Sequence, residues 1–141
     1  MSAIVVGYDG SAGAELALDR ALDLALALGD PLVVAYAAEP PGRIAGEEFG
    51  EHRRSLEELG RAATEHAVQR AEARGVEVEP VVVPQRPADA LIRLADERGA
   101  RMIVVGASGE GPIAGVILGS VPYKLLHRST VPVLVVPGGH A

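Results

Sequence analysis

The sequence contains no cysteine and no tryptophan, and its aromatic residues are one phenylalanine and three tyrosines. Without cysteine there can be no disulfide, no thiolate nucleophile and no zinc-thiolate site. Because aromatic side chains are so few, alanine and aliphatic side chains must supply the core, which suits helices packed closely on a sheet. With 141 residues the chain is long enough for one such core, and we expect a single domain over residues 1–141.

Positive charge is also scarce. Thirteen lysines and arginines face 19 aspartates and glutamates, the net charge is −6, and the longest basic run is Arg53-Arg54. This balance repels nucleic acid and anionic membranes, so we expect neither as a partner. No apolar run approaches the roughly 18 residues of a membrane span, and the first residues lack the features of a signal peptide. These absences favour a cytoplasmic protein.

Motifs of catalysis and metal binding are missing as well. The four histidines show no pairing at metal-ligand spacing, so we expect them to be surface or structural residues: His52, His66, His127 and His140. There is no Gly-x-Ser-x-Gly elbow for a nucleophilic serine. We therefore assign no catalytic residue.

Strand-like and helix-like segments alternate along the chain. The apolar runs typical of buried strands are Ala3–Tyr8, Leu32–Ala38, Val76–Val83, Arg101–Gly106 and Thr130–Val136. The segments with helical periodicity are Ala12–Leu28, Glu51–Arg74, Ala88–Arg98 and Val121–Arg128. This alternation predicts an α/β fold with parallel strands and crossover helices on both faces of the sheet. Pro132 lacks a backbone donor, which predicts that the fifth strand lies at a sheet edge, where we expect self-association.

A glycine-rich stretch, Gly106–Ser120, joins the fourth predicted strand to the last helix. Glycines let backbone N–H groups converge on an anion, and the free N–H groups of the following helix add to that. Ser120 is the expected N-cap of this helix. A Walker A motif would need lysine where Pro112 stands, and the dinucleotide fingerprint would need glycine where Ala114 stands. The stretch thus predicts a phosphate-binding loop of a different kind.

Asp9 follows the first predicted strand and precedes a helix whose expected N-cap is Ser11. In open α/β sheets ligands bind outside the carboxyl ends of the strands. A carboxylate at this place could accept ribose hydroxyls or help to hold Mg²⁺. The alternative role is local capping of the turn, and both roles remain open at this point.

The spacing of the glycine-rich stretch resembles a known family. Gly106-x-x-Gly109, nine further residues and then Gly119-Ser120 are similar to the signature of the nucleotide-binding branch of the universal stress protein family. Four other segments resemble that family too: Val5–Ser11, Pro87–Ile92, Met102–Gly106 and Ser129–Val136. The resemblance covers nearly the whole chain except about residues 42–57.

The resemblance implies a doubly wound five-stranded parallel sheet of order 3-2-1-4-5 with four helices on its two faces. It also implies a dimer through the fifth strands, Val131–Val136, and ATP as the ligand, with or without Mg²⁺. The adenine and ribose would lie near Asp9, which is also the metal candidate, and near the backbone of Ala37 or, if the alignment slips by one, Tyr36. The phosphates would lie on Gly106, Gly109, Gly119 and Ser120, with Val105 and Val121 flanking them. Ser108, inside the same stretch, is a further candidate donor to the phosphates rather than a nucleophile.

The sequence departs from the family pattern at three positions. Arg101 replaces a usual aspartate at the amino end of the fourth strand, away from the ligand, so we expect little effect. Glu110 would oppose the phosphates if it faced them and would be harmless if it faced water. Pro122 is compatible only with the first turn of the last helix.

Three functions remain in competition. The first is a nucleotide-binding regulatory or stress-response module. The second is a slow ATPase, although the sequence offers no convincing base or arginine finger near the phosphates. The third is a stress-linked dimeric interaction protein that binds no nucleotide.

Overall fold

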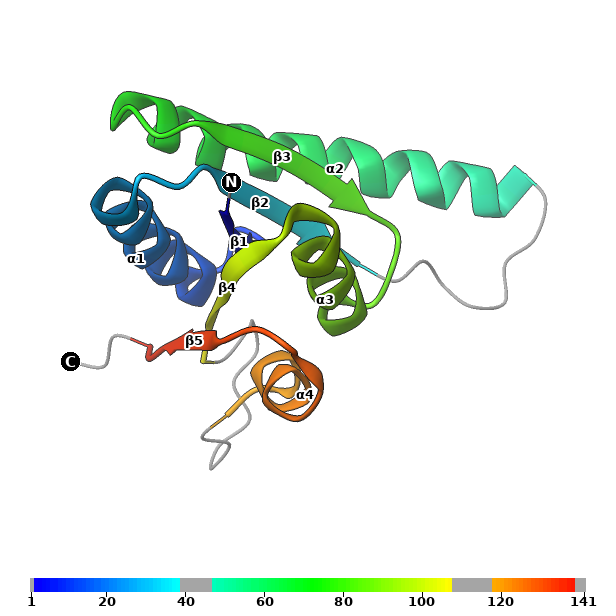
Figure 1. Cartoon of the computed structure of the whole chain (residues 1–141). Coiled ribbons are helices and arrows are strands. Elements are labelled where there is room, and N and C mark those ends of the chain that lie inside the picture. Colours follow the sequence, from blue (N-terminus) through cyan, green and yellow to red (C-terminus); the bar gives the residue numbers. More distant parts are fainter. Residues whose placement is uncertain (1, 39–46, 108–117, 139–141) are drawn as a thin grey trace.

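The computed structural model describes residues 2–38, 47–107 and 118–138. Strands and helices alternate along the chain as the sequence predicts (Figure 1). The elements are β1 (Ala3–Gly7), α1 (Ala12–Leu28), β2 (Leu32–Ala37), α2 (Glu47–Ala73), β3 (Val78–Val83), α3 (Pro87–Arg98), β4 (Ala100–Gly106), α4 (Ser120–Arg128) and β5 (Val133–Val136).

The five strands form one parallel sheet of order β3-β2-β1-β4-β5, which confirms the order implied by the family resemblance. β1 lies at the centre, where Val5 is paired with Val33 of β2 on one side and with Ile103 of β4 on the other. β5 lies at an edge of the sheet, as Pro132 predicted.

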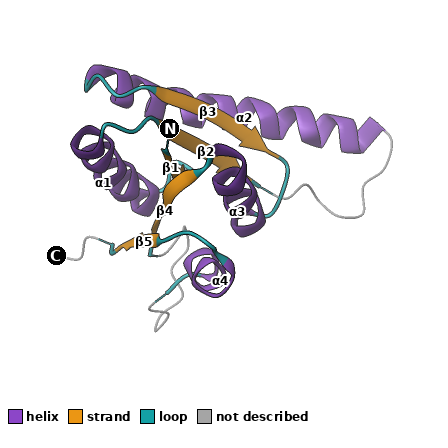
Figure 2. Ribbon diagram, viewed as in Figure 1, coloured by secondary structure: helices purple, strands orange, loops and turns teal. Residues whose placement is uncertain are grey.

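Helices cover both faces of the sheet (Figure 2). On one face, α1 and α2 pack on alternate strand residues such as Ile4 and Val34, and Leu18 of α1 is fully buried there. On the other face, α3 and α4 pack on the intervening residues such as Val5, with Leu91 of α3 and Leu125 of α4 in that core. The strands are therefore apolar on both faces, which is why they read as continuous runs in the sequence.

Four strands are shorter than predicted, and β4 begins one residue earlier than predicted, at Ala100. Residues beyond the strand ends still make ladder-like hydrogen bonds. Tyr8 N–H donates to the carbonyl of Ala35, and Ala38 N–H donates to the carbonyl of Val83. Pro132, predicted inside the fifth strand, lies just before β5 and accepts the N–H of Ile103 at 2.9 Å. Because Pro132 has no N–H to donate, the regular ladder begins only after it.

Helix ends follow local sequence more closely. Ser11 caps α1, as predicted, by accepting the N–H of Ala14 at 3.2 Å, and Gly29 ends the helix with a left-handed φ of 72°. The predicted start of the second helix at Glu51 was wrong, since α2 begins at Glu47. The polar composition of that stretch suggested a loop, although glutamate is favoured at helix starts.

Candidate functional site

The strand order reverses between β1 and β4, which are neighbours at the centre of the sheet. From β1 the chain enters α1 on one face, and from β4 it proceeds to α4 on the other face. The connections that leave these two strands therefore diverge, and in doubly wound folds ligands bind in the crevice outside such a point. Asp9 and Gly106, both predicted as site residues, lie at this edge.

Asp9 performs the capping role that the sequence left open. Its Oδ1 accepts the backbone N–H of Ser11 at 3.0 Å, which fixes the turn between β1 and α1. The residue is exposed. Capping uses one carboxylate oxygen, so the second remains for a ligand hydroxyl or a cation, and the two roles are compatible.

Gly106 ends β4 in close contact with the first turn of α1. A Cβ at this position would lie 2.8 Å from the carbonyl oxygen of Gly13, a separation at which the backbone would have to move. Glycine is thus required here by packing, independently of any ligand. Sequence reasoning assigned Gly106 to phosphate binding alone and did not anticipate this contact, because Gly13 lies far away in the chain.

The two ends of the glycine-rich stretch are held together. The N–H of Gly119 donates to the carbonyl of Ala107 at 2.7 Å, and Ala107 N–H donates to Val136 at 2.8 Å. The start of α4 is thereby joined to the end of β4. Ser108, Gly109 and Glu110 fall between these ends and lie outside the described residues.

The N-cap of α4 is Gly119, and the prediction of Ser120 for this role was wrong. Gly119 has extended backbone angles and its carbonyl accepts the N–H of Tyr123, so Ser120 is the first helical residue, and no side chain caps this end. The N–H groups of Ser120 and Val121 precede the first intrahelical bond, whereas Pro122 lies in the first turn, as expected. Since Gly119 N–H is already engaged, those two N–H groups are the ones that α4 presents.

The predicted flanking residues have apolar surroundings. Val105 is buried in β4, and Val121 is partly buried against the core formed with α3. They flank the glycine-rich stretch in the sequence, and their side chains offer no hydrogen-bonding group.

Ala37 ends β2, beside the carboxyl end of β1, and is paired with Val83 of β3. Its side chain belongs to the face covered by α3. Tyr36, the alternative, has its ring beneath α2, where a Cβ on Gly60 would lie 2.9 Å from the Tyr36 Cδ1 atom. The backbone of Ala37 therefore shares the edge of the sheet with Asp9.

A charged network adjoins the turn that carries Asp9. The buried Tyr8 donates its hydroxyl to Oε1 of Glu15, and Arg70 of α2 binds both Glu15 and Asp19 of α1. His66 Nε2 lies 3.7 Å from Glu15 Oε2. Burial, together with the hydrogen bond and charge of Glu15, raises the pKa of Tyr8 far above its ordinary value. The sequence offered no signal for this network, because its members come from separate elements.

Two negative findings concern the described ranges 2–38, 47–107 and 118–138. Within them, no group of three histidine, aspartate or glutamate residues is arranged to hold a metal ion. Within them also, no helix combines the length and apolar character needed to cross a membrane.

The sequence pattern of the universal stress protein family matches residues 1–137. The universal stress protein Rv1636 of Mycobacterium tuberculosis is 39% identical to this chain in an alignment that covers 94% of each chain.

Solved structures agree with this match. The structure of a universal stress protein in complex with cAMP has a TM-score of 0.73 at 36% identity and covers 98% of both chains. UspA from Lactobacillus plantarum has a TM-score of 0.83 at 18% identity, covers 96% of this chain and 97% of its own, and supports the fold alone.

Proposed function

The chain belongs to the universal stress protein family, and from this premise we propose that it is an ATP-binding regulatory or stress-response module. One observation carries the proposal. The hydrogen bond from Gly119 to Ala107 joins the start of α4 to the end of β4, at the edge of the sheet where the exposed carboxylate of Asp9 follows the neighbouring strand β1. The free N–H groups at the start of a helix favour an anion, and a carboxylate at the same edge of the sheet can accept ribose hydroxyls.

In this proposal the nucleotide lies along the carboxyl edge of the sheet. The base and ribose contact the Ala37 backbone and Asp9, which are brought to one edge by the pairing of β1 with β2. The phosphates lie over the start of α4, where the N–H groups of Ser120 and Val121 and the positive end of the helix dipole favour negative charge. Gly106, Ser108 and Gly109 belong to the same proposed phosphate site, and Gly119 holds it closed.

The relative in complex with cAMP supports an adenine nucleotide as the ligand class. ATP, and Mg²⁺ held between its phosphates and Asp9, are the finer parts of the proposal. Magnesium commonly binds through one carboxylate together with substrate phosphates, so a single aspartate is sufficient. We assign no catalytic residue and expect hydrolysis to be slow at most.

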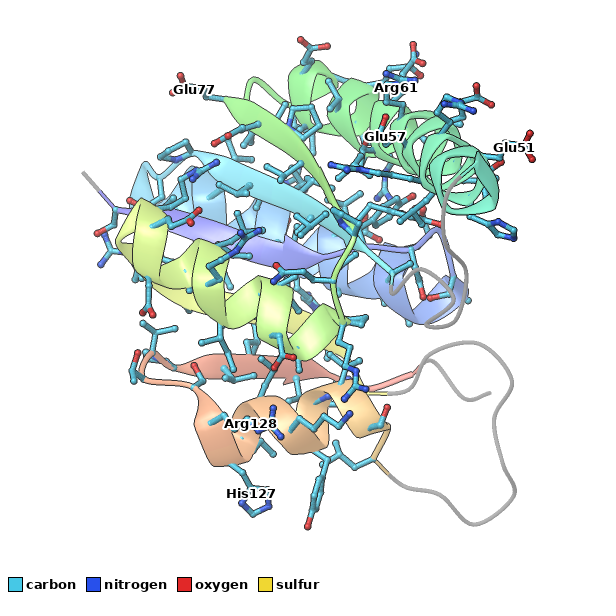
Figure 3. All side chains as sticks on the ribbon, turned by 90° about the vertical axis from the view of Figure 1, so that its right-hand side faces the viewer. Glu51, Glu57, Arg61, Glu77, His127 and Arg128 are labelled. Carbon is cyan, nitrogen blue, oxygen red and sulfur yellow. The ribbon has the colours of Figure 1, made fainter. Side chains whose placement is uncertain are left out.

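We further propose that the chain forms a homodimer through β5 in the cytoplasm. Leu134 of β5 is exposed, as are Tyr123 and Leu126 of the adjacent α4. Figure 3 shows α4 and β5 together at one end of the molecule, opposite α2. An exposed apolar edge strand favours pairing with another chain. The same observation favours the second candidate function, a dimeric interaction protein that binds no nucleotide.

Thermal unfolding with ATP, GTP and FMN separates the candidates. A ligand at a hundredfold excess over its Kd stabilises the folded state by about 2.7 kcal/mol, so ATP should raise the unfolding temperature while GTP and FMN should not. No shift at millimolar ATP, with no nucleotide in mass spectra of the purified protein, would support the interaction protein instead. Phosphate release faster than in buffer would support the ATPase.

A further inference from the structure

Gln85 carries a buried polar atom without a partner. Its side-chain oxygen Oε1 is shielded from solvent and accepts no hydrogen bond within the part of the chain that the structure describes. Native proteins seldom leave such an atom unsatisfied, because burial removes the hydrogen bonds that water would otherwise make. A hydrogen-bond donor on a bound ligand would satisfy this oxygen, and that explanation can be tested.

The position of Gln85 relates it to the candidate site. β3 ends at Val83, which is paired with Ala37 at the end of β2. α3 begins at Pro87 and packs over β1, where a Cβ on Gly7 would lie 3.1 Å from Leu91. The turn from β3 to α3 must therefore cross the carboxyl end of β2 (Figure 1). Gln85 lies in the middle of this turn, on the same edge as the backbone of Ala37.

We propose that Gln85 determines base specificity: its side chain, which is partly exposed as a whole, turns on binding so that Oε1 accepts a hydrogen bond from the exocyclic amino group of adenine. This inference rests on the proposed nucleotide site and places a side chain beside its base. Adenine carries an amino donor at C6, whereas hypoxanthine and guanine carry a carbonyl oxygen there. A carbonyl base would bring two acceptors together in a buried place, which disfavours binding. Gln85 thus selects adenine by its amino group.

The binding experiment compares ATP with inosine triphosphate, whose base has a carbonyl at C6. Dissociation constants are measured by calorimetry for the wild type, Gln85→Met and Gln69→Met. Methionine resembles glutamine in length but has no amide, and Gln69 is exposed on α2, so Q69M makes the same change away from the site. We expect the wild type to bind ATP at least about tenfold tighter than inosine triphosphate. In Q85M the affinity for ATP should fall about tenfold and the preference for ATP over inosine triphosphate should disappear. Q69M should bind both nucleotides with the affinities of the wild type.

Unfolding without nucleotide provides an independent measurement. Replacing an unsatisfied buried acceptor with an apolar side chain should leave the unfolding temperature of Q85M equal to that of the wild type or higher. A clearly lower temperature would mean that Oε1 has a structural partner and would overturn the inference.

The outcomes for the two proposals are distinguishable. If the wild type binds ATP and Q85M keeps the same preference over inosine triphosphate, the role of Gln85 is wrong and the nucleotide site stands. A wild type that prefers inosine triphosphate would also contradict this role, since the side chain would then present a donor. If the wild type binds neither nucleotide, both proposals fail.

Discussion

Arg101, at the start of β4, forms a two-point contact with Asp30 in the turn between α1 and β2. Its Nε lies 2.6 Å from Oδ2 and its Nη2 lies 3.3 Å from Oδ1. The Asp30 side chain is only 5% exposed, and the guanidinium hydrogen bond holds the pKa of that carboxyl below its ordinary value despite the opposing effect of burial. The contact lies at the amino edge of the sheet, away from the candidate site, as expected for Arg101.

Removing this contact should lower stability in a pH-dependent way. A carboxyl whose pKa is lowered by folding contributes stability above its unfolded pKa, near 4, and loses it as the pH falls through the folded value. Arg101→Ala should therefore unfold at a lower temperature than the wild type at pH 7, and the difference should narrow below about pH 4. Calorimetry at pH 7 and pH 3 measures the two unfolding temperatures. Arg20→Ala is the control, because Arg20 makes a longer and exposed contact with Asp23. If the difference in unfolding temperature between Arg101→Ala and the wild type did not change with pH, the charge of Asp30 would not be what stabilises this contact.

Asp9→Asn should separate capping from ligand binding. Asparagine keeps a carbonyl oxygen that can accept the N–H of Ser11, so the turn and the unfolding temperature should change little. The loss of charge should weaken ATP binding about tenfold, with a larger loss when Mg²⁺ is present. Titration calorimetry with and without Mg²⁺ measures both effects. Asp89→Asn, at an exposed aspartate of α3 paired with Arg128, is the matched control, and equal effects of the two changes would count against the site.

Two glycines of α2 should respond oppositely to alanine. A Cβ on Gly60 would lie 2.7 Å from Val82 and 2.9 Å from Tyr36, whereas a Cβ on Gly50 has its nearest neighbour at 3.6 Å, on the flexible end of Arg54. Gly60→Ala should destabilise by about 1–3 kcal/mol through overpacking. Gly50→Ala should stabilise by up to about 1 kcal/mol through helix propensity. Urea unfolding measures both, and a stabilised G60A would show that α2 does not approach the sheet so closely.

The buried hydroxyl of Tyr8 should make the fold sensitive to alkali. Its folded pKa is raised above its unfolded value, so its contribution to stability is complete below about pH 10 and is lost as the pH rises beyond that. Tyrosinate absorbance should show one of the three tyrosines ionising only as the protein unfolds. Tyr8→Phe should flatten the loss of stability with rising pH, and Tyr123→Phe, which removes an exposed hydroxyl, serves as the control. A Tyr8 that ionises in the native state would refute the burial argument.

Leu134→Lys should yield a monomer if β5 forms the dimer interface. A buried charge on each side of a two-fold contact is disfavoured, and lysine on an edge strand opposes pairing. Leu59→Lys is the control, because Leu59 is 62% exposed against 38% for Leu134. Leu59 belongs to α2, the helix at the end of the molecule opposite α4 and β5 (Figure 3). Light scattering after gel filtration measures the mass. A dimer that survives L134K, or dissociates with L59K instead, would place the interface elsewhere.

Much of the fold was predictable because its signals are local or repetitive. Ser11 marked the start of α1 through capping chemistry, and valine-rich runs marked strands that are apolar on both faces. The strand order itself came from the resemblance to a family and is confirmed, whereas periodicity alone specified only parallel strands with crossover helices. The start of α2 and the cap of α4 were predicted wrongly, since polar composition and a nearby serine do not determine which backbone carbonyl begins a helix.

Some features of the candidate site were likewise predictable from local sequence, and others were not. Local sequence alone determined that a carboxylate and a glycine-rich stretch follow two strands of a parallel sheet, because residue type and periodicity depend only on neighbours in the chain. Tertiary structure decided that Gly106 packs against Gly13 too closely for a side chain, and that the N–H of Gly119 binds the carbonyl of Ala107. It also decided that the turn carrying Gln85 passes the end of β2 and leaves the Gln85 Oε1 without a hydrogen-bond partner. These contacts join residues distant in sequence, and only packing of the whole sheet brings their atoms within reach.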